Sequence, residues 1–111
     1  MSFVVEITKA GKARQEESAK SFELVVKVGV AFADKQLKKR GPFVDTDKLA
    51  ELVAAHAAYL SSDAWSALFK FKPTYELVTK WLAEELKPHV KQLEYVELEN
   101  KTLGIVTQYI P

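Results

Sequence analysis

Alternating apolar and polar positions predict two strands in the first third of the chain. The first covers Phe3 to Thr8, and the second covers Phe22 to Phe32, where one face is apolar throughout. The stretch between them, Lys9 to Ser21, is polar and charged, and it predicts a long loop or an extension of the two-stranded ribbon. The other face of the second strand is only partly polar, so we expect helices or another subunit to cover the sheet.

The middle of the chain has the spacing of two amphipathic helices. Apolar residues recur at helical intervals from Leu49 to Leu60, and one helical turn is expected at 64–69. The second helix is predicted to begin at its capping residue Thr74 and to end before Pro88. Its side chains expected to face the core are Leu77, Val78, Trp81, Leu82 and Leu86.

Alternation returns near the C-terminus and predicts a closing hairpin. Its strands cover Tyr95 to Asn100 and Ile105 to Tyr109, and the short turn between them ends at Gly104. The element order is therefore β-β-α-α-β-β. Two hairpins that flank two helices predict an α+β fold in a single domain over residues 1–111, with a four-stranded antiparallel sheet and both helices on one face.

The composition is that of an ordinary globular protein, and it excludes several kinds of site. The chain is 48% hydrophobic and 28% charged, has no apolar run long enough to span a bilayer, and lacks a signal-peptide pattern, so we expect a cytoplasmic protein. The absence of cysteine excludes disulfides, cysteine-ligated zinc and a thiol nucleophile. A net charge of +1 gives no general attraction to nucleic acid, and the basic run Lys35 to Arg40 is expected to be a solvated hairpin tip.

Four short segments together resemble one enzyme family. They are Val44-Asp45-Thr46-Asp47-Lys48-Leu49, Ser62 to Leu68, Pro73-Thr74-Tyr75-Glu76, and Val96 to Glu99. This order resembles the 6-pyruvoyl- and 6-carboxy-tetrahydropterin synthases, small zinc enzymes of the tunnelling fold (T-fold). The resemblance covers most of the chain but is specific only from about Gly41 onward. It implies the T-fold and a closed homo-oligomer with its ligand pocket between subunits.

The resemblance implies which residues would bind a ligand. In the family, a glutamate on the third strand accepts hydrogen bonds from the ring N–H and the amine of a pterin or purine, and its counterpart here is Glu99. The Pro-Thr-x-Glu segment adds Thr74 as a ligand-binding residue. The alternative for Glu99 is a solvated strand glutamate, because Glu94 and Glu97 lie close to it in the sequence.

The family's catalytic groups have no counterparts in this sequence. A catalytic zinc needs about three protein ligands, and the corresponding segments, Ile7 to Gly11 and Ser18 to Phe22, contain no histidine. The family's catalytic histidine corresponds to Ala64, which leaves Asp63 as a weak catalytic candidate. Lys20 could supply positive charge to an anionic ligand, or it could lie in a solvated ribbon. We therefore expect neither a metal nor a cofactor.

Several ring-bearing side chains have two interpretations. His56 lies on the apolar stripe of the first helix, so we expect a packed or pocket-edge histidine rather than a ligand. His89 follows Pro88 and is expected to be solvated. Phe69, Phe71 and Tyr75 could stack on a heterocycle, although packing in the core is the commoner use of such residues.

Together these features predict that the protein binds a small pterin- or purine-like heterocycle through Glu99, without zinc-dependent synthase activity. Its expected partners are this ligand and further copies of itself, with no membrane and no nucleic acid. Two alternatives stay open. The first is an active synthase-like lyase with non-standard catalytic residues, and the second is a non-catalytic T-fold assembly or binding module.

Overall fold

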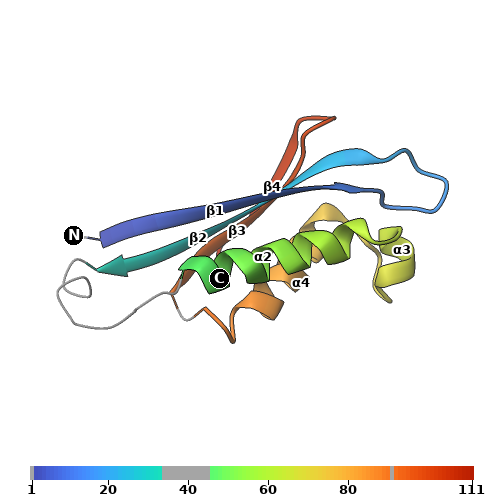
Figure 1. Cartoon of the computed structure of the whole chain (residues 1–111). Coiled ribbons are helices and arrows are strands. Elements are labelled where there is room, and N and C mark those ends of the chain that lie inside the picture. The colour runs from blue at the N-terminus through green and yellow to red at the C-terminus, as the bar shows by residue number, and fades with distance from the viewer. Residues whose placement is uncertain (1, 34–45, 91) are drawn as a thin grey trace.

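The fold is a four-stranded antiparallel sheet with helices on one face, as the computed structural model shows (Figure 1). The structure describes residues 2–33, 46–90 and 92–111. The strands, in their order across the sheet, are β1 (Ser2–Ala13), β2 (Phe22–Ala33), β3 (Leu93–Asn100) and β4 (Ile105–Tyr109). Between β2 and β3 lie α2 (Thr46–Ser61), the single turn α3 (Trp65–Leu68) and α4 (Tyr75–Leu86). The α+β class and the antiparallel sheet predicted from the sequence are confirmed.

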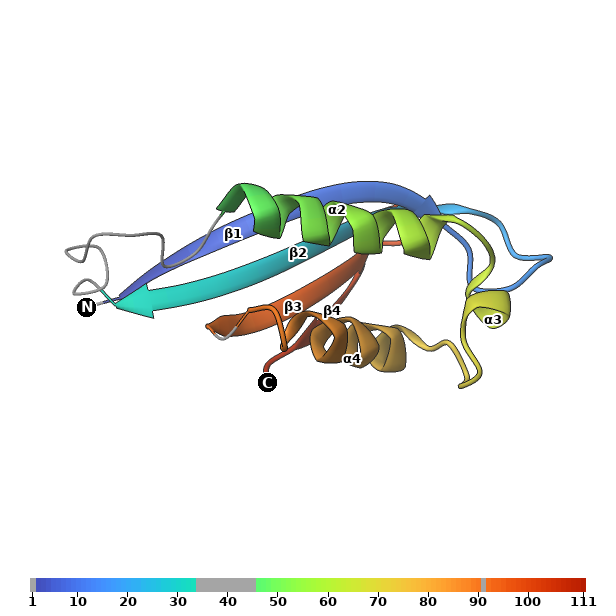
Figure 2. The same ribbon diagram turned by 60° about the horizontal axis from the view of Figure 1, so that its bottom comes forward.

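Both long helices cover the same face of the sheet (Figure 2). The helix α2 runs along β1 and β2, and α4 runs along β3 and β4. On β2, Leu24 and Val26 are fully buried beneath the helices, whereas the intervening Val25 lies half-buried on the other face. The core therefore lies between the helices and one face of the sheet, and no helix or strand that the structure describes covers the opposite face, which is called the uncovered face below.

The helix α4 has the predicted ends, and its buried face agrees with the prediction at Val78, Leu82 and Leu86 but not at Leu77. Its N-cap Thr74 accepts a hydrogen bond from the backbone N–H of Leu77 at 3.2 Å, and the helix ends at Leu86, before Pro88. The side chain of Leu77, which was predicted to face the core, is 42% exposed, so this prediction is wrong. The buried residues of α4 are Val78, Thr79, Leu82, Ala83 and Leu86. The Thr79 hydroxyl can be buried because it donates a hydrogen bond to the carbonyl of Tyr75 at 2.6 Å.

The strand β1 is longer than the apolar alternation predicts. It continues through Lys9 to Ala13, which pairs with Phe22 at the start of β2, so the expected ribbon extension is confirmed there. Beneath the end of α2, Gly11 lies so close to Ser61 that a Cβ at this position would collide with the hydroxyl oxygen. The same oxygen accepts a hydrogen bond from the backbone N–H of Lys12 at 3.2 Å. Residues 14–21 form the remaining loop.

Two expectations concern residues outside the described ranges. They are the basic run Lys35 to Arg40 and the Val44-Asp45 entry to the first long helix. Within the described ranges, no helix is both long enough and apolar enough to cross a membrane.

Candidate functional site

The uncovered face of the sheet carries Glu99. Along β3, Val96, Leu98 and Asn100 point beneath the helices, and the residues between them point to the uncovered face. Across the sheet, Glu99 pairs with Val25 on β2 and with Val106 on β4. Its side chain is half-buried and makes no hydrogen bond or ion pair with any residue that the structure describes. Glu99 is therefore a carboxylate with unused acceptors between two apolar neighbours.

Glu97 lies on the same face of β3 but has partners within the sheet. One of its carboxylate oxygens is 3.8 Å from the Nζ of Lys27 on β2. The other accepts a hydrogen bond of 3.4 Å from the Gln108 side chain on β4. Its side chain is only 17% exposed. Of these two glutamates, Glu99 has the greater capacity to accept hydrogen bonds from a ligand, because Glu97 already neutralises a lysine.

A pocket of about 380 Å³ opens on the helix-covered side, at the same end of the sheet. It lies where the loop 14–21, the start of α4 and the turn between β3 and β4 meet. Its walls include Gln15, Lys20, Phe22, Tyr75 and Asn100. An ammonium group, a phenol and an amide thus border one cavity, which suits a ligand with both polar and ring atoms.

A buried amide organises this pocket. Asn100 is 1% exposed, and its Nδ2 donates a hydrogen bond to the hydroxyl oxygen of Tyr75 at 3.0 Å. Its Oδ1 accepts from the backbone N–H of Leu103 at 2.9 Å, which fixes the turn after β3. Since Tyr75 uses its oxygen as the acceptor, its O–H hydrogen is available to a ligand. Asn100 was not among the site residues predicted from the sequence, although its polar side chain follows Val96 and Leu98 at the next inward-facing position of the strand, which is a usable signal.

In one chain, the predicted ligand-binding residues lie on two faces of the sheet. Glu99 faces the uncovered side, whereas Lys20 borders the pocket on the helix side. Thr74 is half-buried at the start of α4, where its hydroxyl oxygen caps the helix beside Tyr75. A single subunit therefore brings Lys20 close to the start of α4 but does not bring either of them to Glu99.

Asp63, the weak catalytic candidate, is held by groups of the protein itself. Its Oδ1 accepts a hydrogen bond from the backbone N–H of Ala64 at 2.7 Å. The same oxygen lies 3.4 Å from the Nη2 of Arg14, whose Nη1 donates to the carbonyl of Glu17 at 3.0 Å. Lys12 and Arg14 also line the polar pocket of about 240 Å³ that Asp63 borders. Asp63 is therefore part of an ion pair that holds the loop 14–21 in place. None of these contacts involves a histidine that Asp63 could orient.

Backbone hydrogen bonds fasten the loop 14–21 to α3. The N–H of Trp65 donates to the carbonyl of Arg14 at 2.9 Å, and the N–H of Ser66 donates to the carbonyl of Gln15 at 3.0 Å. The Gln15 side chain in turn donates to the carbonyl of Pro73 at 3.2 Å. The loop that carries Lys20 is therefore held in one position relative to α4.

The residues that the sequence resemblance places at zinc positions do not fit a zinc ion. Ser18 and Lys20 are exposed in the loop, and neither a hydroxyl nor an ammonium group replaces an imidazole as a zinc ligand. Among the residues that the structure describes, no three His, Cys, Asp or Glu side chains gather as a metal-binding group. No zinc-dependent step can be derived from these residues.

The histidines and aromatic residues divide between packing and pocket walls. His56 lines a pocket between α2 and α4, as predicted for a pocket-edge residue, and His89 is exposed. Phe69 and Phe71 stack on each other with ring centroids 4.8 Å apart, and Phe69 packs on Trp81, so both serve the packing of the helices.

Known proteins provide no assignment for this site. No family model matches the chain, and no curated protein matches it at a significant level. We therefore infer the function from the chemistry of the residues and from their geometry.

Proposed function

We propose that this protein binds a pterin- or purine-like heterocycle through Glu99 and does not carry out the zinc-dependent synthase reaction. The observation that carries the proposal is the half-buried carboxylate of Glu99 between Val25 and Val106, which has no polar partner among the described residues. A pterin or guanine edge presents a ring N–H beside an amine, and one carboxylate can accept a hydrogen bond from each. Val106 is 52% exposed, so the valines would exclude water and strengthen this charge-assisted pairing once a further copy covers Val106.

The arrangement of the elements supports a T-fold relationship. The order β-β-α-α-β-β, the sheet order β1-β2-β3-β4 and the helices on one face all agree with the fold that the sequence resemblance implies. The additional turn α3 lies between the two long helices and does not change the order of the strands. Fold alone does not establish function, so the proposal depends on the site.

The edges of the sheet support self-association. Large exposed apolar side chains gather on or beside the two edge strands: Phe3 and Val4 on β1, and Leu103, Ile105, Val106 and Ile110 around β4. Edge strands offer unpaired backbone groups, and joining β4 of one copy to β1 of the next would bury these side chains. Such a head-to-tail contact closes into a ring when the rotation between copies permits it. The next copy would then lie beside the residues on the uncovered face of β3, which include Glu99, and would complete the ligand pocket.

The two alternative functions make different demands on the site. A lyase with non-standard residues needs a proton-transferring group beside the ligand, but Asp63 is engaged with Arg14 and the backbone of Ala64. A non-catalytic assembly module needs the apolar edges but not the unpartnered Glu99. Ligand titration therefore separates binding from assembly, and any turnover of the bound compound would favour the lyase.

The binding proposal is tested by calorimetric titration of guanosine and of a pterin into the wild type, Glu99→Gln and Glu97→Gln. Glu99→Gln places an amide donor opposite a ligand donor, and we expect it to weaken binding by roughly 2–4 kcal/mol. Glu97→Gln, the matched control on the same face, should change binding by less than about 1 kcal/mol. Equal losses from both substitutions, or no binding of either compound, would refute the role of Glu99.

Self-association is tested by light scattering on the wild type and on Val4→Lys. We expect one closed oligomer for the wild type and smaller species for the variant, because a charge on an edge strand opposes pairing. A monodisperse wild-type monomer at micromolar concentration would contradict both the oligomer and a pocket shared between subunits.

A further inference from the structure

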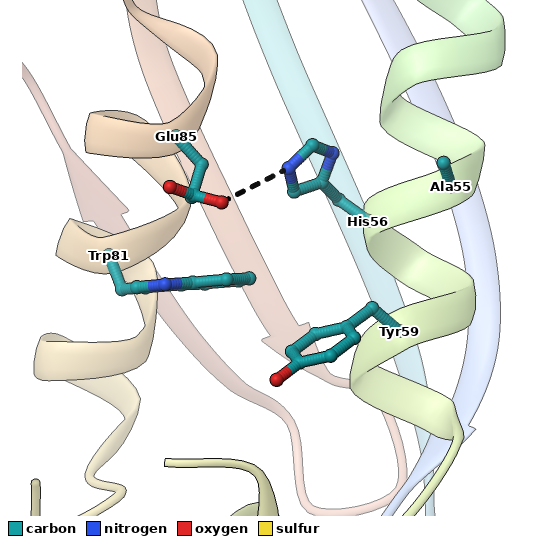
Figure 3. A pocket seen from close by; sticks show the side chains of 5 residues that line it. All are labelled: Ala55, His56, Tyr59, Trp81 and Glu85. Atoms are coloured by element: carbon teal, nitrogen blue, oxygen red, sulfur yellow. Dashed lines mark ion pairs between the residues drawn. The ribbon is translucent and has the colours of Figure 1, made fainter. Parts of the chain in front are cut away.

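A further concave site lies on the helix side of the molecule, between α2 and α4 (Figure 3). It has a volume of about 430 Å³, within the range of small-molecule pockets. His56 and Tyr59 line it from α2, and Trp81 and Glu85 line it from α4. The sheet separates this pocket from Glu99, so its ligand would be independent of the proposed heterocycle.

The indole of Trp81 is held in place by neighbouring rings. Tyr59 stacks on it with centroids 5.6 Å apart and an interplanar angle of 30°. Phe69 meets it edge-on at 4.8 Å and 68°. The indole lies between the Tyr59 ring on one side and the pair formed by His56 and Glu85 on the other (Figure 3). One face of a fixed indole is thus turned toward a carboxylate and an imidazole.

When the imidazole of His56 is neutral, His56 and Glu85 present two hydrogen-bond acceptors to each other. The Nδ1 of His56 lies 2.8 Å from the carbonyl oxygen of Leu52, which can only accept, so Nδ1 carries the hydrogen. In the neutral imidazole, Nε2 is then an acceptor. It lies 4.0 Å from the Oε1 of Glu85, too far for a direct hydrogen bond. A group with two N–H donors above the indole would satisfy both atoms.

We propose that this pocket binds a guanidinium group, carried by a free guanidino compound or by an arginine side chain of a partner. A guanidinium is planar, stacks on aromatic faces and has forked N–H donors. Trp81 provides the strongest aromatic surface for a cation, and Glu85 provides the opposite charge. The described lining contains no lysine or arginine that would repel such a ligand. An ammonium group is a compact, strongly hydrated point charge. It would stack less well on the flat indole than a guanidinium and would bond less well to both acceptors at once.

The intrinsic fluorescence of Trp81 provides the measurement. The chain has two tryptophans, and because Trp65 is fully buried, the half-buried Trp81 is the reporter that an added ligand can reach. The probes are methylguanidinium, blocked arginine and blocked citrulline, the last a neutral isostere. Concentrations stay below about 50 mM so that guanidinium does not act as a denaturant. We expect saturable binding of both cations with a Kd on the order of millimolar, and none of citrulline.

A matched pair of variants assigns the binding to Glu85. Glu85→Gln keeps the shape of the side chain and should weaken binding about tenfold, because it removes a charge-assisted hydrogen bond. Glu84→Gln makes the same charge change one residue earlier, at an exposed position beside Tyr109 and outside this pocket, and should change binding less than about twofold.

The outcomes separate the two sources of the guanidinium and also define failure. Blocked arginine that binds about tenfold more tightly than methylguanidinium would indicate an arginine of a partner, because backbone groups would then contribute. Equal affinities would indicate a free guanidino compound. No saturable change in fluorescence, an equal response to citrulline, or equal losses in Glu85→Gln and Glu84→Gln would each overturn the proposal.

Discussion

Replacing Gly29 with alanine should destabilise the fold, because the ring of Tyr95 occupies the space that a β-carbon would take. A Cβ at Gly29 would lie closer than 3.0 Å to three atoms of that ring. The backbone of Gly29 is not in the left-handed region, so the collision alone makes alanine unfavourable. Displacing the ring costs free energy, because its hydroxyl donates a hydrogen bond to Glu6 on β1.

The magnitude follows from three contributions. Overpacking costs about 1–3 kcal/mol, and loss of the bond from Tyr95 to Glu6 costs about 1 kcal/mol. The change from glycine to alanine returns about 0.5–1 kcal/mol, because alanine loses less backbone freedom on folding. We therefore expect Gly29→Ala to lower the free energy of unfolding by about 1–3 kcal/mol.

The assay is urea denaturation of the wild type, Gly29→Ala, Tyr95→Ala and the double variant, followed by circular dichroism at one protein concentration. With the ring removed by Tyr95→Ala, the alanine at position 29 should stabilise the fold by about 0.5–1 kcal/mol, so the sign of its effect reverses. An equal loss of stability in both backgrounds would refute the collision between Gly29 and Tyr95.

Further substitutions test three features, the packing, the capping and the loop, each by urea denaturation. Leu82→Ala, on the buried face of α4, should cost about 3–4 kcal/mol, and Leu77→Ala on its exposed side should cost less than about 1 kcal/mol. Thr74→Ala should cost about 1 kcal/mol by removing the acceptor for the Leu77 N–H, and Thr74→Ser should restore most of it. Arg14→Met should cost less than about 1 kcal/mol, because its partner Asp63 is half exposed; a loss above about 2 kcal/mol would contradict this.

Period-two alternation was sufficient to locate most of the sheet. The predicted strand from Ile105 to Tyr109 has the observed bounds, and β3 begins two residues before the predicted Tyr95. The extension of β1 through Ala13 could not be decided from the sequence, because its pairing with β2 and the close approach of Ser61 depend on tertiary structure. Local pattern therefore locates a strand but not the full length over which it pairs.

The orientation of α4 was the main error in the helices. The apolar character of Leu77 suggested a buried position, but the buried face of the helix includes Thr79 instead. A threonine can occupy the core because its hydroxyl bonds to the carbonyl one turn earlier, that of Tyr75. Residue polarity alone therefore placed Leu77 in the core and left Thr79 out, whereas Val78, Leu82 and Leu86 are buried as predicted.

The family resemblance selected Glu99, but the sequence contains no physical reason for preferring it to Glu97. The distinction depends on Lys27 and Gln108, which come from other strands and occupy only Glu97. The pocket between α2 and α4 could not be predicted from the sequence either. His56 and Trp81 were expected on apolar stripes, and their meeting at a cavity depends on how the two helices pack.

The attachment of the first loop to α3 has a consequence for local unfolding. A four-residue turn such as α3 has no stability of its own, so the hydrogen bonds from Trp65 and Ser66 to the loop hold both segments together. Trp65 is fully buried and packs edge-on against Phe22, which joins this unit to the core. The amide hydrogens of Trp65 and Ser66 should therefore exchange with solvent only when the loop and α3 open as one unit. A charged surface loop of this kind tolerates changes in its exposed side chains, whereas a change in its length would open part of the core.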